Sequence, residues 1–298
     1  MPVGVIGLGD IAQKAYLPVV SALPGLDLRL MTRDRAKLDR LGETYRVDAG
    51  SRFTDLDELI DSGIRAAFVH AATDQHVPIT ERLLRAGVDV YVDKPLDYTV
   101  DGARKLVDLA DRTGRSLMVG FNRRHAPGYA QALERPRDLI VLQKNREGLP
   151  EAARTLVFDD FVHVVDTLRF LVPGEIDHVD VRARKDREGL VEHVVLTLGG
   201  EGFTALGIMN RLSGSTEEVL EVSGGDSKRE VRNLAEVIDH RGQPTVRRRG
   251  DWVSVARQRG IEQCVLGFLD AVRAGKTLDA HDALRTHELC ELIVERIG

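Results

Sequence analysis

Over the first 120 residues, short apolar runs alternate with amphipathic segments. The apolar runs predict five strands, at residues 3–6, 26–31, 66–70, 88–92 and 116–119. Segments with helical spacing between them predict helices at residues 10–22, 36–45, 77–86 and 100–113. The predicted strands are almost continuously hydrophobic, which is typical of parallel strands covered on both faces. We therefore expect an α/β domain with a doubly wound parallel sheet over residues 1–120.

The pattern changes after Gly120. A helix predicted at residues 157–171 is followed by four strands that no helix separates, at residues 179–183, 192–198, 203–210 and 217–223. Successive strands without helices between them indicate an antiparallel sheet. Two helical patterns, 261–274 and 280–297, close the chain, and the basic cluster 247–249 is expected in a solvated loop.

Composition narrows the class of partner. The chain has 298 residues, of which 43% are hydrophobic and 30% charged, and its net charge is -5. Such a balance gives no basic field for binding nucleic acid. Cys264 and Cys290 form no CxxC pair, which favours a reducing compartment. Without a basic leader or an apolar run of roughly 18 residues, we expect a cytoplasmic protein that does not bind membranes.

A glycine-rich turn follows the first predicted strand. Gly7 and Gly9 begin a G-x-G-x-x-A pattern that ends at Ala12 and opens a predicted helix. In this context Gly7 permits a tight turn and Gly9 lets the backbone approach a pyrophosphate, while Ala12 still allows close helix packing. The turn predicts a dinucleotide site; the alternative is a plain connection between strand and helix.

The end of the second predicted strand bears on which dinucleotide binds. Thr32 stands where an NAD site usually has an acidic residue, and Arg33 follows it. A hydroxyl beside a guanidinium suits a 2′-phosphate, because Arg forms charge-assisted bonds to phosphate oxygens. NADP(H) is therefore favoured and NAD(H) remains possible, since Asp34 could instead hold the ribose while Arg33 and Arg35 are surface charges.

Three further motifs follow the glycine turn in order: VDKP at residues 92–95, GFNRR at 120–124 and DDFVHVVD at 159–166. Together these four motifs resemble the Gfo/Idh/MocA family of NAD(P)-dependent oxidoreductases, and especially its MviM-like branch. The resemblance spans essentially the whole chain. It implies a Rossmann domain at residues 1–120 and an α/β domain with an open, mainly antiparallel sheet at 121–276, which would bind substrate and mediate oligomerisation. A C-terminal helix at 277–298 would pack back on the first domain.

The resemblance also implies a catalytic set, Lys94, Asp159 and His163. His163 has the ordinary pKa best suited to exchanging a proton near neutrality, and Asp159 one turn earlier could orient its ring. Lys94 would stabilise the developing negative charge on the substrate oxygen. The chain departs from the family pattern at Phe161, where glycine is common, and in the loop 72–76, which lacks the usual Thr-Pro.

The expected binding residues come from these motifs and from neighbouring strand ends and loops. For the cofactor they are Gly7, Gly9, Asp10, Ile11, Thr32, Arg33, Ala71, Ala72, His76, Asp93, Lys94 and Asn122. For the substrate they are Lys94, Arg123, Arg124, Lys144, Arg146 and His163. For the two arginines after residue 122, a salt bridge between the domains is the alternative, and Lys144 and Arg146 suit an anionic or polyhydroxyl substrate.

The resulting hypothesis is a dehydrogenase or reductase that acts on a hydroxyl or carbonyl group of a small polar substrate, a sugar or cyclitol derivative. The alternative is a catalytically silent NAD(P)-binding regulator. The histidines show no clustered ligand pattern, so no metal is expected. Exposed sheet faces in the second domain favour a homodimer or homotetramer.

Overall fold

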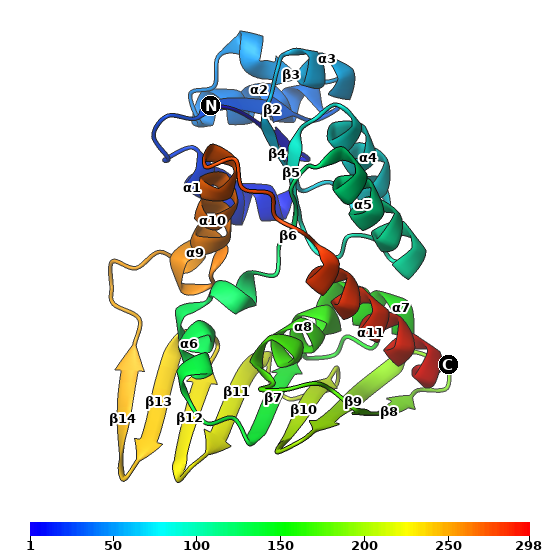
Figure 1. Ribbon diagram of the computed structural model, residues 1–298, viewed down its shortest axis with the longest axis vertical. Helices are drawn as coiled ribbons and strands as arrows, with labels where there is room; N and C mark the ends of the chain where they lie inside the picture. The colour runs from blue at the N-terminus through cyan, green and yellow to red at the C-terminus, as the bar shows by residue number, and fades with distance from the viewer. The chain divides into compact units, whose positions relative to one another are not determined.

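The computed structural model describes residues 1–298 and divides them into two compact units (Figure 1). Unit 1 contains residues 1–120 and 261–284, and unit 2 contains residues 121–260 and 285–298. The chain thus enters unit 2 after Gly120 and passes back through unit 1 before it ends.

Unit 1 is built on a six-stranded sheet in the order β3-β2-β1-β4-β5-β6, with all neighbouring strands parallel. This is the strand order of a Rossmann sheet. Strands β2 and β3 are added on one side of β1, and strands β4, β5 and β6 are added on its other side. The strands are β1 (Pro2–Ile6), β2 (Asp27–Met31), β3 (Arg52–Phe53), β4 (Ala66–Val69), β5 (Asp89–Val92) and β6 (Leu117–Val119). The helical segments are η1 (Ala12–Tyr16), α1 (Leu17–Val20), α2 (Arg35–Thr44), η2 (Ala49–Ser51), α3 (Leu56–Asp61), η3 (Thr73–Gln75), α4 (His76–Arg85), α5 (Val100–Thr113) and α10 (Ile261–Arg273). The expected doubly wound parallel sheet is confirmed.

An aromatic cluster holds α10 in unit 1. The Phe268 ring lies 5.4 Å from that of Phe68 on β4 and 5.8 Å from that of Tyr91 on β5, both edge-on. The Tyr91 hydroxyl is 2.9 Å from the hydroxyl of Tyr16, so both buried phenols have a hydrogen-bond partner. Such edge-to-face pairs stabilise a core beyond the area that they bury. A helix near the end of the sequence therefore completes the core of the first unit.

Unit 2 is built on an eight-stranded sheet in the order β14-β13-β12-β11-β7-β10-β9-β8. Only β7 and β10 pair in parallel, so the expected mainly antiparallel sheet is confirmed. The strands are β7 (Leu139–Asn145), β8 (His178–Lys185), β9 (Val191–Gly200), β10 (Phe203–Asn210), β11 (Glu217–Gly224), β12 (Ser227–Arg232), β13 (Glu236–Arg241) and β14 (Gln243–Arg248). The helical segments are η4 (Asn122–His125), α6 (Pro127–Ala130), η5 (Gln131–Glu134), α7 (Ala153–Thr155), η6 (Leu156–Phe161), α8 (Val162–Leu171) and α9 (Val255–Gln258).

One continuous helical stretch covers the middle of this sheet. It runs through α7, the π-helical turn η6 and α8, and α8 packs on β7 and β10 (Figure 1). Gly207 on β10 makes the close approach possible, because a Cβ there would lie 2.8 Å from a methyl group of Val164 and 2.9 Å from one of Leu168. The helix that carries the DDFVHVVD motif is therefore fixed on the sheet by a position that only glycine fits.

The C-terminal helix is divided between the two units. In helix α11 (His281–Ile297), the residues before 285 belong to unit 1 and residues 285–298 belong to unit 2. Within unit 2, the Thr286 hydroxyl donates to the Asp166 carboxylate at 3.0 Å, and Glu291 pairs with Arg154 at 2.5 Å. The packing of 277–298 on the first domain stays a prediction.

The basic cluster 247–249 differs from the expected loop. Arg247 and Arg248 lie on the edge strand β14, where they pair with Asp239 and Glu236 of β13 at 2.6 Å each. Charged side chains on an edge strand discourage pairing with another sheet.

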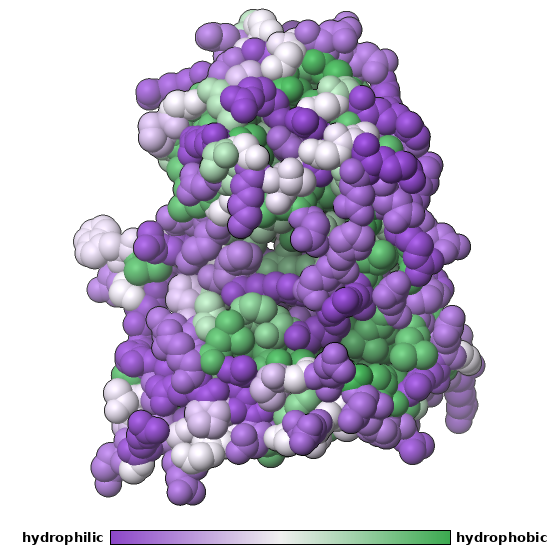
Figure 2. All heavy atoms as spheres, in the orientation of Figure 1, coloured by the Kyte–Doolittle hydropathy of each residue, from purple (hydrophilic) through white to green (hydrophobic).

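The surface shows no single dominant apolar face in the view of Figure 2. Polar and charged side chains cover most of the face shown in Figure 2, and apolar patches appear among them, including over the helical layer of unit 2. Both Cys264 and Cys290 are buried free thiols. Among the helices, none combines the length and the apolar character that crossing a bilayer requires.

Candidate active site

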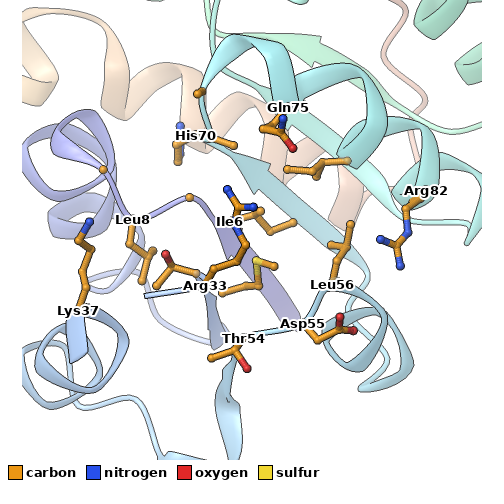
Figure 3. Close-up of a pocket in the computed structure, with 17 residues that line it drawn as sticks. Ile6, Leu8, Arg33, Lys37, Thr54, Asp55, Leu56, His70, Gln75 and Arg82 are labelled. Carbon is orange, nitrogen blue, oxygen red and sulfur yellow. The ribbon is translucent and has the colours of Figure 1, made fainter. Parts of the chain in front are cut away.

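A cavity of about 420 Å³ opens at the carboxyl end of the unit 1 sheet, where ligands bind in folds of this type. The turn after β1, the end of β2 and the loop after β4 form its walls (Figure 3). Of the expected cofactor residues, those that line it are Gly7, Gly9, Thr32, Arg33, Ala71 and Ala72. The volume lies within the range of cofactor and small-molecule sites.

The two glycines of the turn have different roles. Gly7 has a φ of +83°, and a Cβ there would lie 2.4 Å from the backbone nitrogen of Ala71, so a side chain would collide with the next loop. A Cβ on Gly9 would meet nothing within 4 Å, and the residue faces the cavity. The backbone at Gly9 is therefore open to a ligand at close range, as a pyrophosphate requires.

One end of the cavity is basic. Arg33 and Lys37 both line it, whereas Asp34 does not. The Asp34 carboxylate instead caps α2 by accepting from the Lys37 backbone nitrogen at 3.0 Å, and this bond lowers the pKa of the carboxyl. Asp55, which also lines the cavity, accepts from two backbone nitrogens at the start of α3. Both nearby carboxylates thus cap helices, and Asp34 also lies 3.6 Å from the ammonium of Lys37, which lines the cavity together with Arg33.

The loop after β5 carries Asp93 and Lys94. The Asp93 carboxylate accepts from the Lys94 backbone nitrogen at 2.8 Å and lies 3.9 Å from the His70 ring. Burial would raise the pKa of Asp93, but His70 and Lys94 outweigh burial and lower it. The Lys94–Pro95 peptide bond is cis.

His76 joins two loops of unit 1. Its ring nitrogens lie 2.7 Å from the Pro95 carbonyl oxygen and 3.0 Å from that of Ala71, and burial lowers its pKa. A neutral ring can donate to only one of these carbonyls. His76 therefore positions the Ala71 loop against the Lys94–Pro95 segment, and it does not line the cavity.

Other expected cofactor residues also lie outside the walls of this cavity. Asp10 pairs with Lys14 at 2.6 Å, Ile11 is 45% exposed beside the glycine turn, and neither lines the cavity. Asn122 belongs to unit 2, where its side-chain amide donates to the Arg259 carbonyl at 2.6 Å. Their contact with a cofactor stays a prediction.

In unit 2, Asp159 lies in the π-helical turn η6 and His163 on α8, both half-buried. A π-helical turn widens the helix locally, and such turns are frequent at functional sites. The adjacent carboxylate, Asp160, lies among three cationic side chains. It accepts from Lys144, from Arg146 at 2.8 and 3.0 Å and from Arg211 at 2.8 Å.

Sequence reasoning missed Lys37, Asp160 and Arg211. Lys37 could have been found, because it lies four residues after Arg33, at the start of the helix predicted at 36–45. Asp160 and Arg211 are 51 positions apart, and only the packing of η6 against the end of the sheet brings them together. Lys144 and Arg146, which were expected to bind substrate, share this carboxylate.

The two arginines of the GFNRR motif are held by carboxylates inside unit 2. Arg123 makes a two-point ion pair with Glu218 at 2.8 and 2.7 Å, and Arg124 pairs with Asp166 at 2.9 and 2.5 Å. Both partners lie in unit 2, so these ion pairs are not the salt bridge between domains that the sequence left as the alternative. A contact of either arginine with substrate stays a prediction.

Comparison with known proteins agrees with this geometry. Residues 1–121 match the family described as "Oxidoreductase family, NAD-binding Rossmann fold", and residues 129–241 match the "YceM-like, C-terminal domain". A Salmonella typhimurium protein named "Putative oxidoreductase YceM" is 31% identical over 91% of this chain and 89% of its own length. Myo-inositol dehydrogenase Hyg17 of Streptomyces leeuwenhoekii is 29% identical over 99% of this chain and 97% of its own.

Solved structures give the same result. A Gfo/Idh/MocA family oxidoreductase from Vibrio cholerae superposes with a TM-score of 0.93 at 31% identity, over 100% of this chain and 98% of that one. The dehydrogenase MviM from Clostridium difficile superposes with a TM-score of 0.93 at 28% identity, over 99% of each chain. With its Rossmann unit, its glycine-lined cavity and these relatives, the chain belongs to the Gfo/Idh/MocA family of NAD(P)-dependent oxidoreductases, in the group of YceM and MviM.

Proposed function

We propose that this oxidoreductase uses NADP(H) in preference to NAD(H) and acts on a hydroxyl or carbonyl group of a sugar or cyclitol derivative. The observation that carries the cofactor preference is the basic end of the unit 1 cavity. Arg33 and Lys37 line it, while the carboxylate of Asp34, the alternative partner for a ribose, caps α2. A 2′-phosphate would meet two cations there, whereas a ribose hydroxyl would have no free acidic partner.

The residues of unit 1 fit such a cofactor. The backbone at Gly7 and Gly9 would hold the pyrophosphate, because the open face of Gly9 leaves room for phosphate oxygens. Thr32, Arg33 and Lys37 would hold the adenosine ribose and its 2′-phosphate. When bound, the nicotinamide supplies or accepts hydride.

We assign proton transfer to His163, because an imidazole is the side chain best suited to exchanging a proton near neutral pH. The family resemblance supports this role, as it supports orientation of the imidazole by Asp159. Lys94 would stabilise negative charge on the substrate oxygen as the proton leaves. The neighbouring Asp93 has a lowered pKa and accepts from the Lys94 backbone nitrogen, so a charged carboxylate lies beside Lys94 at neutral pH.

The substrate class is supported by a relative that aligns with almost the whole chain and is named a myo-inositol dehydrogenase. A cyclitol or sugar has many hydroxyl groups and few apolar atoms, so recognition depends on polar side chains. Unit 2 offers a dense set of these around Asp160.

Cofactor affinity tests the proposal. Dissociation constants for NADPH and NADH are measured by calorimetry for the wild type, Arg33→Ala and the control Arg35→Ala. Arg33→Ala should weaken NADPH binding by roughly 1.5–3 kcal/mol, about ten- to a hundredfold or more, because hydrogen bonds to a charged group are lost. The affinity for NADH should stay nearly unchanged. Arg35 pairs with Asp39 on the surface of α2 and does not line the cavity, so its removal should change neither constant. Equal losses of NADPH and NADH affinity in Arg33→Ala would refute the 2′-phosphate assignment.

We also propose a homo-oligomer formed through the sheet of unit 2. Along β10, Gly207 and its alternate neighbours face α8, so Leu206 and Ile208 lie on the opposite face, where both stay half-exposed. Val141 on the neighbouring strand β7 is half-exposed as well. Light scattering should give a dimer or tetramer for the wild type and a smaller species for Leu206→Lys. A monomeric wild type at micromolar concentration would contradict this assembly.

A further inference from the structure

Unit 2 contains a second cavity, of about 170 Å³, that the proposed cofactor site does not include. It lies between β7, β11, the turn after β12 and the residue that follows α9. The volume is several times the roughly 30 Å³ that one water molecule occupies in the liquid, so it can admit a small polar group. Six charged side chains line it: Arg123, Lys144, Arg146, Glu217, Glu218 and Arg259.

The charges in the walls do not balance. Glu218 neutralises Arg123 through a two-point ion pair and also accepts from the Tyr129 hydroxyl at 3.0 Å. By contrast, the single carboxylate of Asp160 is shared by three cations, those of Lys144, Arg146 and Arg211. Two of these three side chains are less than one-tenth exposed, so solvent screens them poorly.

Arg259 adds a further cation at the mouth of the cavity. Its side chain is exposed and forms no ion pair, while Glu217, the remaining carboxylate of the wall, accepts from the Asn145 amide at 3.1 Å. The Arg259 backbone is nevertheless fixed, because its carbonyl accepts from Asn122 and the next residue, Gly260, packs against the Asn122 carbonyl, 2.1 Å from where a Cβ would lie. The guanidinium thus projects from an anchored point beside Arg123.

Burial and neighbouring cations both act on Arg146. Burial lowers the pKa of its guanidinium, and the nearby cations of Arg211, Arg123 and Arg259 lower it further, although Glu218 opposes them. The guanidinium also donates to Asp160 at 2.8 and 3.0 Å, a carboxylate that it shares with Lys144 and Arg211. A bound anion would relieve the remaining repulsion among these cations.

We propose that this cavity binds an anionic group, a carboxylate or a phosphate, carried by the polyhydroxyl substrate. Lys144, whose side chain is 4% exposed, lines the cavity together with Arg146 and Arg259. Arginine forms two parallel hydrogen bonds with either kind of anion, which fixes orientation as well as affinity. The inference rests on the proposed function in taking the bound molecule to be the substrate; binding itself is measured without turnover.

Calorimetric titration of the NADP⁺-saturated protein tests this inference with three probes that share a sugar ring. Glucose 6-phosphate carries a phosphate, glucuronate carries a carboxylate and glucose carries neither. At least one anionic probe should bind tenfold or more tightly than glucose, and the preferred probe identifies the anion. The gain should shrink as salt is raised, because part of the interaction is solvent-exposed.

Variants assign the binding to this cavity. Arg259→Gln should weaken binding of the preferred anionic probe about tenfold or more while leaving glucose and NADP⁺ affinity unchanged, and Arg146→Gln should weaken binding of that probe more than binding of glucose. Arg259 makes no ion pair, so Arg259→Gln should fold like the wild type even if Arg146→Gln, which disturbs the Asp160 cluster, does not. The matched control is Arg187→Gln, an exposed arginine in the turn between β8 and β9.

The outcomes separate the two proposals. Equal binding of all three probes, or unchanged anion binding in Arg259→Gln, overturns the anionic site. If an anionic probe binds and its binding depends on Arg259, the anionic site is supported. If no carbonyl compound then oxidises NADPH, the proposed reaction is refuted while the anionic site stands.

Discussion

The buried Arg123–Glu218 pair should make the stability of unit 2 depend on pH in a predictable way. The two side chains are 7% and 10% exposed and joined by two hydrogen bonds. Burial alone would raise the pKa of Glu218, but Arg123 and the donors around it outweigh burial and lower the pKa from 4.5 to about 2. At about 1.4 kcal/mol for each pH unit, this difference corresponds to roughly 3 kcal/mol.

The sign follows from the direction of the change. A carboxyl group whose folded pKa is lowered stabilises the folded state above its unfolded pKa, here near 4.5. This contribution should be complete at pH 7 and should be lost as the pH falls from about 4.5 towards 2. Glu218→Gln removes the charge while keeping the shape, and leaves Arg123 buried without an anion. The variant should therefore be less stable than the wild type by roughly 3–5 kcal/mol at pH 7.

Urea unfolding at pH 7, 5, 4 and 3 provides the measurement, with amide hydrogen exchange in β7 and β11 as the readout specific to unit 2. The difference between the wild type and Glu218→Gln should shrink as the pH falls, because protonated Glu218 is as neutral as glutamine. Glu201→Gln, in the exposed turn between β9 and β10, is the control and should match the wild type throughout. A difference that stays constant from pH 7 to pH 3 would refute the assignment of this energy to the ion pair.

Two further variants test the reaction site. Gly9→Val should abolish NADPH binding yet leave the melting temperature close to that of the wild type, because a Cβ at Gly9 meets no atom within 4 Å. The control Gly50→Val, at a position equally open but outside the cavity, should bind NADPH normally. Binding of NADPH by Gly9→Val would exclude the turn from the site. His163→Ala should reduce single-turnover hydride transfer by about 10²–10⁴-fold with little change in NADPH affinity, and full activity across the pH range would refute its role as acid and base.

The first unit was predictable because its central strands β1, β4 and β5 are buried along almost their whole length. Continuous apolar runs such as Ala66–Val69 have few alternative structures, and the glycine turn between a strand and a helix indicates its own function. Two elements were too short to show a hydrophobic period in the sequence, the strand Arg52–Phe53 and the helix Leu56–Asp61. Strand β14 carries one aliphatic residue, Val246, and exists through its pairing with β13.

Properties that depend on distant contacts were not predictable. An amphipathic pattern shows that a helix buries one face, but it does not show which unit receives that face, as α10 and α11 illustrate. The pairing of Asp160 with Lys144 and Arg211 joins three separate elements, so no local spacing indicates it. The motif at residues 159–166 indicated a helix, which the structure contains, but it gave no sign that Asp160 contacts Lys144 and Arg211 of other elements.

Hydride transfer by this chain is tested most directly with NADPH deuterated at the transferable C4 position. The wild type is incubated with keto-inositols, keto-sugars and their carboxylate and phosphate derivatives, and mass spectrometry measures deuterium in the alcohol product. Deuterium should appear on the carbinol carbon of at least one product, and none should appear with Gly9→Val. Stoichiometric binding of NADPH without deuterium transfer to any carbonyl compound in the set would contradict the proposed reaction.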